Sequence, residues 1–327
     1  MKKLFGLLSF VVVVGIGCTK TSLTEQQEPE STPAVTGNLS QRGCASEEVL
    51  QQHLKDDPTL AARMQAIEEL TARYEQNPSA SRLVNGMIEI PVVVNVLYKT
   101  AAQNISPAQI QSQIDVLNAD FSGTNSDNTS VPATFTGVKA GDVGVRFVLA
   151  GVVRKATNKT SWSTNDAMKK GTQGGISPTS PSTTLNMWCC NMGGGILGYA
   201  QFPGGSLATD GVVMDDNAFG VTGVSGPYTN GRTATHEVGH WLNLRHIWGD
   251  ATCGNDFVTD TPLHTGANYG CPAPNTRSSC AGTPVMMTMN YMDYTNDLCM
   301  YMFSTGQKTR MNATFAAGGG RNSFAQP

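Results

Sequence analysis

Residues His236–His246 read HEVGHWLNLRH and contain three of the five histidines in the chain. In a helix, side chains four positions apart lie on one face, so His236 and His240 are placed to bind a single metal ion. Glu237 then lies beside the metal, in the position of a general base. A zinc ion with three protein ligands keeps a fourth position for water, whose pKa falls to about 7. The pattern predicts such a zinc centre, and the alternative is a surface helix with incidental histidines.

The third ligand must come from beyond the end of that helix. His246 lies six residues after His240, so the helix has to end and the chain has to turn near Asn243. Asparagine tolerates the left-handed backbone conformation that this turn needs. The spacing therefore predicts His236, His240 and His246 as the zinc ligands.

With these residues the sequence resembles the metzincin zinc peptidases, and within them the ulilysin-like members of the pappalysin family. The metzincin pattern HExxHxxGxxH is matched except that Asn243 stands at the glycine position. The segment Asn290–Tyr294 is similar to the family's Met-turn, which implies that Met292 forms a hydrophobic base under the metal. The resemblance also implies that the phenol of Tyr294 swings onto the tetrahedral intermediate. From the residues alone, core filling is the alternative for Met292, because Met286–Met311 holds seven methionines.

A glycine-rich segment, Gly193–Gly198, fits the pattern GxGxxG. A dinucleotide site needs a helix after that pattern, whereas here Phe202 and Pro203 break the chain. We expect the segment to lead into an edge strand at the cleft. In metzincins a peptide substrate adds to such a strand by β-augmentation. The substrate-binding residues implied by the resemblance are Gly198, Tyr199 and Ala200.

Four of the eight cysteines follow the zinc motif. Cysteines of an exported chain usually form disulfides, and no Cys-x-x-Cys spacing supports the alternative of a structural zinc site. Two bridges are therefore expected, and the family pattern implies the pairs Cys253–Cys280 and Cys271–Cys299. Cys189 and Cys190 are adjacent and have no assigned role.

A short acidic loop follows the third histidine. Asp250, Asp256 and Asp260, with Thr259 nearby, offer hard oxygen ligands. The resemblance implies structural calcium, with Asp256, Thr259 and Asp260 as its ligands. A solvated acidic loop is the alternative.

Ulilysin-like enzymes favour a basic residue immediately after the scissile bond, and a buried cation needs an acidic partner. Asp297 is the candidate for that acid. However, the residue directly before the following cysteine is Leu298, which would favour apolar side chains. A third interpretation limits Asp297 to holding its own loop. If the basic preference holds, self-cleavage is expected between Ser81 and Arg82.

The N-terminus indicates export. Two lysines precede the apolar run Leu4–Gly17, which is too short to span a bilayer and suits a secretory signal. The run ends in Gly15–Cys18, which resembles a lipobox, so residues 1–18 are predicted to be a signal peptide with Cys18 lipidated. Gly15 replaces the usual leucine, which keeps ordinary secretion open. The predicted location is the cell envelope, the outer surface or the medium.

Residues 19–81 have the character of a pro-segment. A polar tether is followed by helical patterns, with Asp57 as the expected N-cap of a helix and Pro58 at its first position. Cys44 has no evident cysteine partner. The resemblance implies a cysteine switch, in which this thiolate binds zinc in place of the water. A free or mispaired thiol is the alternative. Residues 77–81 then form a cleavable hinge.

The body of the chain, residues 82–327, mixes strand and helix patterns. Strands are predicted at 87–98, 145–153, 184–190, 197–201 and 211–215, and a helix with an apolar stripe begins at Ser106. This order indicates an α+β domain. The resemblance implies a metzincin-like peptidase domain with a twisted mixed sheet, an active-site helix and a backing helix, preceded by the helical pro-segment.

The charge balance bears on the partners. The 327 residues include 22 Lys and Arg against 25 Asp and Glu, a net charge of −3, which argues against nucleic acid. The expected partners are protein or peptide substrates, with membrane contact only through a lipid anchor, and the chain is expected to be a monomer. Two functions compete: an exported zinc endopeptidase, and an inactive surface lipoprotein that keeps a metal-bound fold for binding. The intact Glu237 favours the enzyme.

Overall fold

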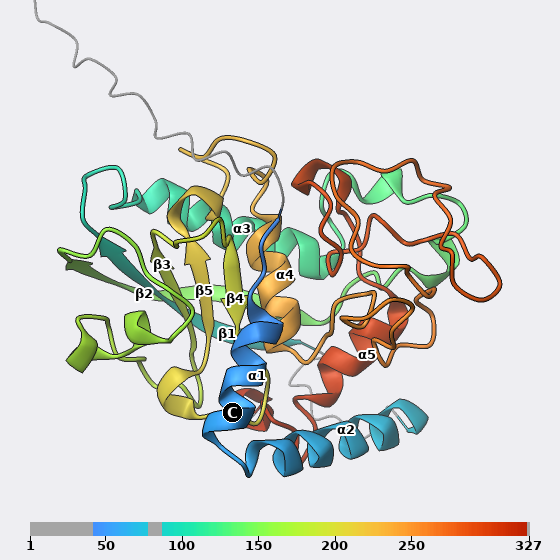
Figure 1. Cartoon of the computed structure of the whole chain (residues 1–327), viewed down its shortest axis with the longest axis horizontal. Helices are drawn as coiled ribbons and strands as arrows, with labels where there is room; N and C mark the ends of the chain where they lie inside the picture. The colour runs from blue at the N-terminus through green and yellow to red at the C-terminus, as the bar shows by residue number, and fades with distance from the viewer. Residues whose placement is uncertain (1–41, 78–86, 326–327) are drawn as a thin grey trace, which may run out of the picture. The chain divides into compact units, whose positions relative to one another are not determined.

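The computed structural model describes residues 42–77 and 87–325 (Figure 1). The predicted signal peptide with Cys18 and the predicted processing site at Ser81 and Arg82 lie outside the described residues. The helices are α1 (Ser46–Asp56), α2 (Leu60–Gln76), α3 (Pro107–Ser122), α4 (Arg232–Trp241) and α5 (Thr305–Ala313). The strands are β1 (Ile88–Tyr98), β2 (Val145–Ala156), β3 (Leu185–Cys190), β4 (Gly198–Ala200) and β5 (Val212–Asp215).

The five strands form one sheet in the order β2-β1-β3-β5-β4. Strands β2, β1, β3 and β5 are parallel to one another, and the edge strand β4 pairs antiparallel with β5. The predicted mixed sheet and all five predicted strands are confirmed. The glycine-rich segment before β4 leads into this edge strand and not into a helix, as expected.

Two helices pack on one face of the sheet. Every second residue of β1 points to this face and is buried against α3 and α4, in a core that includes Val92, Val94, Leu117, Phe121 and Val238. Helix α3 begins as predicted, because Ser106 Oγ accepts a hydrogen bond from Gln109 N and Pro107 takes the first position. The α+β architecture with a backing helix and a second helix carrying the zinc motif is therefore confirmed.

The adjacent cysteines of β3 are both buried and free. Cys189 packs in the core on the α3 and α4 side, and Cys190 packs in the core on the opposite face. Because successive strand residues point to opposite faces, the two thiols fill separate cores.

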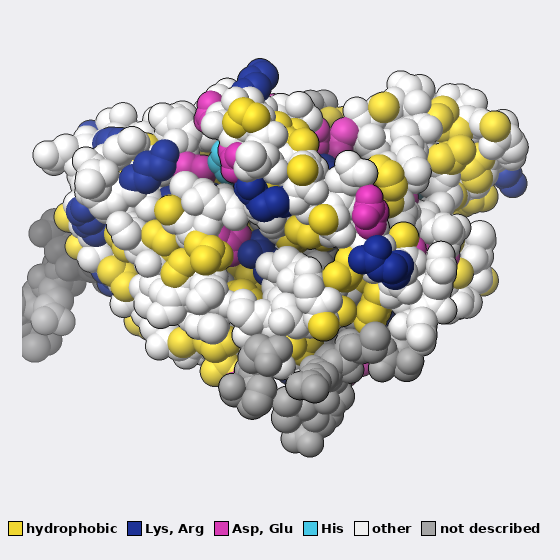
Figure 2. Space-filling view, turned by 90° about the horizontal axis from the view of Figure 1, so that it is seen from below, with side chains coloured by type: hydrophobic (Ala, Val, Ile, Leu, Met, Phe, Trp, Pro, Cys, Tyr) yellow, Lys and Arg dark blue, Asp and Glu magenta, His cyan; other side chains and the backbone are white. Residues whose placement is uncertain are grey.

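The predicted pro-segment contains α1 and α2. Figure 1 shows α1 alongside β4 and α4, and α2 beside α5. Helix α2 buries the predicted apolar stripe, which includes Leu60, Met64 and Ile67. It begins at Leu60 and not at Pro58, because Asp57 Oδ1 accepts a hydrogen bond from Thr59 N and holds the preceding turn. On the face seen in Figure 2, where α2 lies, acidic, basic and hydrophobic side chains are interspersed.

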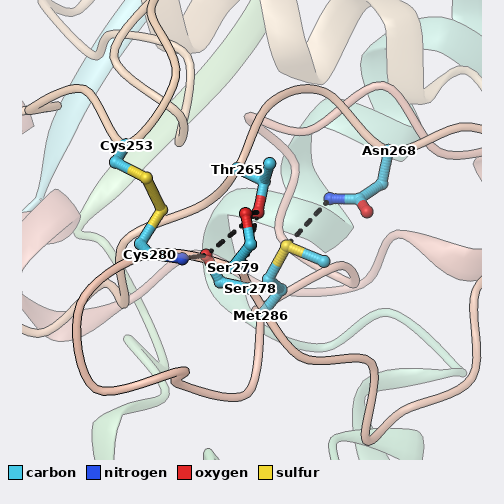
Figure 3. The surroundings of a disulfide bond; sticks show 7 residues. All are labelled: Cys253, Thr265, Asn268, Ser278, Ser279, Cys280 and Met286. Atoms are coloured by element: carbon cyan, nitrogen blue, oxygen red, sulfur yellow. Dashed lines mark hydrogen bonds between the residues drawn. A yellow bond between two sulfur atoms is a disulfide. The ribbon is translucent and has the colours of Figure 1, made fainter.

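The chain between α4 and α5 is mostly loop and carries both disulfides. The bridges are Cys253–Cys280 and Cys271–Cys299, so both implied pairings are confirmed. Figure 3 shows the first bridge beside a cluster of hydroxyl side chains, in which Ser278 Oγ accepts a hydrogen bond from Cys280 N. Within residues 42–77 and 87–325, none of the helices is both long and apolar enough to cross a bilayer.

Candidate active site

Three imidazole rings converge at the end of α4 and just beyond it. The Nε2 atom of His240 lies 3.2 Å from that of His236 and 3.1 Å from that of His246. All three side chains are buried. In a tetrahedral zinc site with Zn–N distances of about 2.0–2.1 Å, two ligand nitrogens lie about 3.3 Å apart. The three nitrogens therefore have the spacing that a zinc ion requires.

The opposite nitrogen of each ring, Nδ1, is hydrogen-bonded to an oxygen atom. For His236 the partner is the carbonyl oxygen of Tyr291 at 2.7 Å, and for His240 it is that of Leu244 at 2.8 Å. For His246 it is the Asp250 carboxylate at 2.5 Å. When Nδ1 donates, the lone pair is on Nε2, which points to the common centre. Burial lowers the pKa of His236 and His240, which also favours their neutral, ligating form.

The turn after α4 brings the third histidine to this centre. Asn243 has φ of 72°, the left-handed conformation that the sequence analysis expected there. Leu244 N donates to Gly239 O at 2.9 Å, and Arg310 Nε donates to Asn243 O at 2.7 Å. These bonds fix the reversal of the chain, so that His246 faces the two helical histidines.

The predicted Met-turn lies against the same helix. Met292 is fully buried, and its Sδ lies so close to Gly239 that a Cβ on this glycine would approach it to 2.5 Å. Ile247 N donates to Met292 O at 3.1 Å. Met292 therefore supports both α4 and the chain just after the third histidine.

Glu237 is fully buried beside β4. Its Oε2 accepts hydrogen bonds from Ser46 Oγ at 2.9 Å and from Cys44 Sγ at 3.5 Å, while Oε1 has no hydrogen-bond partner in the described part of the chain. Burial raises the pKa of this carboxyl to about 7, and the bonds from Ser46 and Cys44 act in the opposite direction. A carboxyl with a pKa near neutrality is suited to take up and return a proton.

The sulfur of Cys44 belongs to the same cluster. Its Sγ and one nitrogen from each of His236, His240 and His246 all lie within 4.8 Å of one another. Burial raises the pKa of the thiol, whereas a bound zinc ion has the opposite effect and favours the thiolate. The structure thus brings all four predicted zinc ligands together.

The pro-segment residues around Cys44 pair with the edge strand β4. The hydrogen bonds run from Leu197 N to Gly43 O (2.7 Å), from Ala45 N to Gly198 O (3.1 Å) and from Ala200 N to Ser46 Oγ (2.8 Å). The two segments run parallel. Residues 43–46 therefore occupy the strand edge at which a substrate was expected to bind.

Two of the three expected substrate-binding residues face this edge. Gly198 and Ala200 do so through their backbone. All three residues pair with β5, but the buried side chain of Tyr199 points away from residues 43–46 and donates a hydrogen bond from its hydroxyl to Asp166 at 2.8 Å. Tyr199 differs from Gly198 and Ala200 because successive residues of a strand point in opposite directions.

Arg42 of the predicted pro-segment is buried in a pocket that Asp297, Thr233 and Tyr228 line. Its guanidinium forms an ion pair with Asp297, donates to Thr233 Oγ1 at 3.0 Å and lies 4.8 Å from the centre of the Tyr228 ring. Both charged side chains are only 1% exposed. The pocket therefore accepts a basic side chain and neutralises it.

Asp297 and Leu298, the two candidates for the residue that sets the specificity, differ in burial. Asp297 begins the short 3-10 helix Asp297–Cys299, and its Oδ2 accepts from Asn230 N and Arg232 N at 2.9 and 3.1 Å. Leu298 is 73% exposed. Asp297 therefore faces the buried guanidinium, and Leu298 faces solvent.

Tyr294 completes the cluster. Its hydroxyl donates to Cys44 O at 3.2 Å, and its ring centre lies 4.9 Å from that of His246 and 5.7 Å from that of His236. The phenol is therefore within reach of a group held at the centre of the three histidines.

Comparison with known proteins identifies the family. Residues 197–316 match the family model described as pregnancy-associated plasma protein-A. The chain is 32% identical to extracellular metalloprotease 1 of Coccidioides posadasii, over 76% of this chain and 84% of that protein. The chain belongs to the pappalysin family. The predicted zinc peptidase is thereby confirmed.

Solved structures of pappalysin-like enzymes agree with this fold. The chain is similar to a promirolysin mutant from Tannerella forsythia, with a TM-score of 0.78, 39% identity and coverage of 86% of this chain and 97% of that chain. It is also similar to mature mirolysin of Tannerella forsythia in complex with a cleaved peptide, with a TM-score of 0.70, 43% identity and coverage of 73% and 95%.

The calcium ligands expected in this pappalysin have local partners. The Asp256 carboxylate accepts from Thr261 Oγ1 at 2.8 and 3.0 Å, and Asp260 accepts from Ser304 Oγ and Gly306 N at 2.6 and 2.8 Å at the start of α5. Thr259 is exposed. The contacts of Asp256 therefore stabilise its own loop, and those of Asp260 connect this loop to the start of α5.

Sequence reasoning gave no role to Arg42 or Ser46 in this pappalysin. Arg42 stands two residues before Cys44, which is the one local signal that links it to the site. Its partner Asp297 is 255 positions away, and such a pairing is visible only in three dimensions.

Proposed function

We propose that this zinc peptidase is an exported endopeptidase, made as a latent precursor, that prefers Arg or Lys immediately after the scissile bond. Residues 1–18 direct export, residues 19–81 form the pro-segment, and residues 82–327 form the catalytic domain. The observation that carries the proposal is the buried pair of Arg42 with Asp297, next to Cys44 at the histidine cluster.

The catalytic work is divided among three kinds of residue. His236, His240 and His246 would hold the zinc ion, which would supply a Lewis acid that polarises the substrate carbonyl and lowers the pKa of water. Glu237 takes a proton from the attacking water and passes it to the leaving amine. Tyr294 donates a hydrogen bond from its hydroxyl to the oxyanion of the tetrahedral intermediate.

Latency follows from the contacts of residues 42–46. In the precursor, Cys44 takes the place of the water, and Ser46 occupies the carboxylate oxygen of Glu237 that the reaction needs. The same segment is hydrogen-bonded to β4, so a substrate strand has no free edge to pair with. The relatives are named extracellular metalloproteases, which supports export.

The specificity follows from the Arg42 pocket. A guanidinium that leaves water must be paired, and the backbone amides of Asn230 and Arg232 hold Asp297 in place to provide that pair. After the pro-segment leaves, a substrate Arg or Lys takes the place of Arg42. An apolar side chain would leave Asp297 buried without a cation.

The test is a peptide library digested by the mature enzyme and read by mass spectrometry. We expect cleavage mainly before Arg and Lys. Asp297→Asn should lower kcat/KM for these peptides by at least about tenfold, because the loss of one partner of a buried ion pair is costly. Leu298→Ala is the matched control and should leave the preference unchanged. Cleavage before apolar residues by the unmodified enzyme would refute the assignment.

Two further parts of the proposal concern anchoring and calcium. The lipobox-like segment supports lipidation of Cys18 and attachment to the envelope. The hard oxygen ligands Asp256, Thr259 and Asp260 support a calcium ion in the loop before α5. Both stay predictions of the sequence.

A further inference from the structure

Two arginines of the catalytic domain form ion pairs with carboxylates of the pro-segment helices. Arg310 binds both oxygens of Glu68, at 2.5 and 2.7 Å, and also holds the turn after α4 through Asn243 O. Arg245 pairs with Glu47, with 3.5 Å between Nη1 and Oε2. Arg310 thus has a structural role of its own, whereas Arg245 needs a different explanation.

Arg245 is poorly satisfied without the pro-segment. Its Nε is buried and has no hydrogen-bond partner in the described residues, and Glu47 is the one carboxylate within ion-pair distance there. The guanidinium lies over the Phe202 ring, 4.4 Å from its centre, and this cation–π contact favours one position of the side chain. Removal of the pro-segment therefore leaves a preoriented cation without its partner.

The order of contacts along the pro-segment places Arg245 in the cleft. Arg42 lies against Asp297, Cys44 against the histidines, Ser46 against Ala200, and Glu47 against Arg245. Asp297 and Arg245 therefore lie on opposite sides of the zinc centre. A substrate whose basic residue follows the scissile bond and binds Asp297 must place its preceding residues towards Arg245.

Phe202 provides the apolar part of this surface. It follows the edge strand β4, lies 5.3 Å from the His240 ring and is covered in the precursor by the apolar side chains of Leu50, Leu60 and Met64. When the pro-segment leaves, an aromatic ring and a guanidinium become accessible together, next to the zinc centre.

We propose that Arg245 and Phe202 form a subsite in the mature enzyme that binds an acidic side chain within about three residues before the scissile bond. In the precursor, Glu47 occupies this subsite three residues after Cys44. The proposal rests on the proposed function, because it takes the direction of the substrate from the Asp297 pocket. It adds a preference for an acidic residue before the scissile bond to the preference for a basic residue after it.

The test uses matched peptides that all carry Arg after the scissile bond and carry Glu, Gln or Lys at one of the three preceding positions. We expect the mature enzyme to cleave the best Glu peptide with a kcat/KM about fivefold higher than its Gln counterpart, the size expected for a partly exposed ion pair, and the Lys peptide least well. Arg245→Gln should remove the difference between Glu and Gln while it leaves cleavage of the Gln peptide within about twofold. The control Arg146→Gln removes a surface cation on β2 that pairs with Asp142 and should keep the preference.

Other outcomes overturn the inference. The unmodified enzyme alone can refute the subsite. It does so if it cleaves the Glu and Gln peptides equally well at both low and high salt. An unchanged Glu preference in Arg245→Gln contradicts the assignment to Arg245. In both cases cleavage before Arg continues, so the proposed function stands; if cleavage before Arg is itself absent, the proposed function fails and the inference fails with it.

Discussion

The side chains of Cys44 and Ser46, in the predicted pro-segment, donate hydrogen bonds to Glu237, the proposed general base. We predict that Cys44→Ala gives a precursor that cleaves a reporter peptide before any processing, because the fourth zinc position is then open to water. The measurement is reporter cleavage by freshly purified precursor, with the N-terminus checked at the same time. Gln51→Ala, an exposed change on α1, is the matched control and should stay latent.

An inactive Cys44→Ala precursor would give a different account of latency. The cover formed by α1, α2 and the strand-like segment beside β4 would then be sufficient, and the thiol would have no part in it.

Single residues also show where sequence reasoning reaches its limit. The convergence of His236, His240 and His246 was predictable, because their spacing along one helix and one turn is local. The choice between Asp297 and Leu298 was not, since adjacent residues of a loop differ only in the direction of their side chains. The structure shows that they differ in burial: Asp297 is 1% exposed and Leu298 is 73% exposed, which supports Asp297 as the proposed pocket residue.

Among the structural elements, the turn after α4 decides whether the third histidine reaches the metal. Asn243 occupies it with φ of 72°. We predict that Asn243→Gly in the mature enzyme keeps full stability, whereas Asn243→Ala lowers the free energy of unfolding by about 1–2 kcal/mol and Tm by about 2–8 °C. Thermal unfolding of the two variants side by side checks this. An equal Tm for both would show that the backbone conformation is not what matters there.

The strands were predictable and the helix boundaries less so. β-branched runs such as Val92–Val96 are buried on both faces and read directly as strands. Helix α2 begins two residues later than predicted, because the Asp57 carboxylate holds a turn that the pattern does not distinguish from helix. The pairing of residues 43–46 with β4 was not predictable, because those residues carry no strand pattern.

At the scale of the whole molecule, maturation must remove a cover that is held at several points. The contacts include two pairs with catalytic-domain arginines, Glu47 with Arg245 and Glu68 with Arg310, and the buried pair of Arg42 with Asp297. We predict self-cleavage between Ser81 and Arg82, because the proposed preference places a basic residue after the scissile bond. N-terminal sequencing of self-matured protein should find Arg82 first, and Asp297→Asn should lose this start. A mature chain that begins at Leu or Met would contradict it.

The proposed catalytic domain is organised around one centre, in which the three histidines are the proposed zinc ligands and Glu237 is the proposed general base. The most direct test is Glu237→Gln, with zinc content measured by mass spectrometry and cleavage of an Arg-containing peptide measured after the pro-segment has been removed by another protease. The account predicts a full equivalent of zinc, an unchanged far-UV spectrum and a fall in kcat of at least about 100-fold, the usual contribution of general acid–base catalysis. A variant that keeps both its zinc and most of its activity would contradict the central role of Glu237.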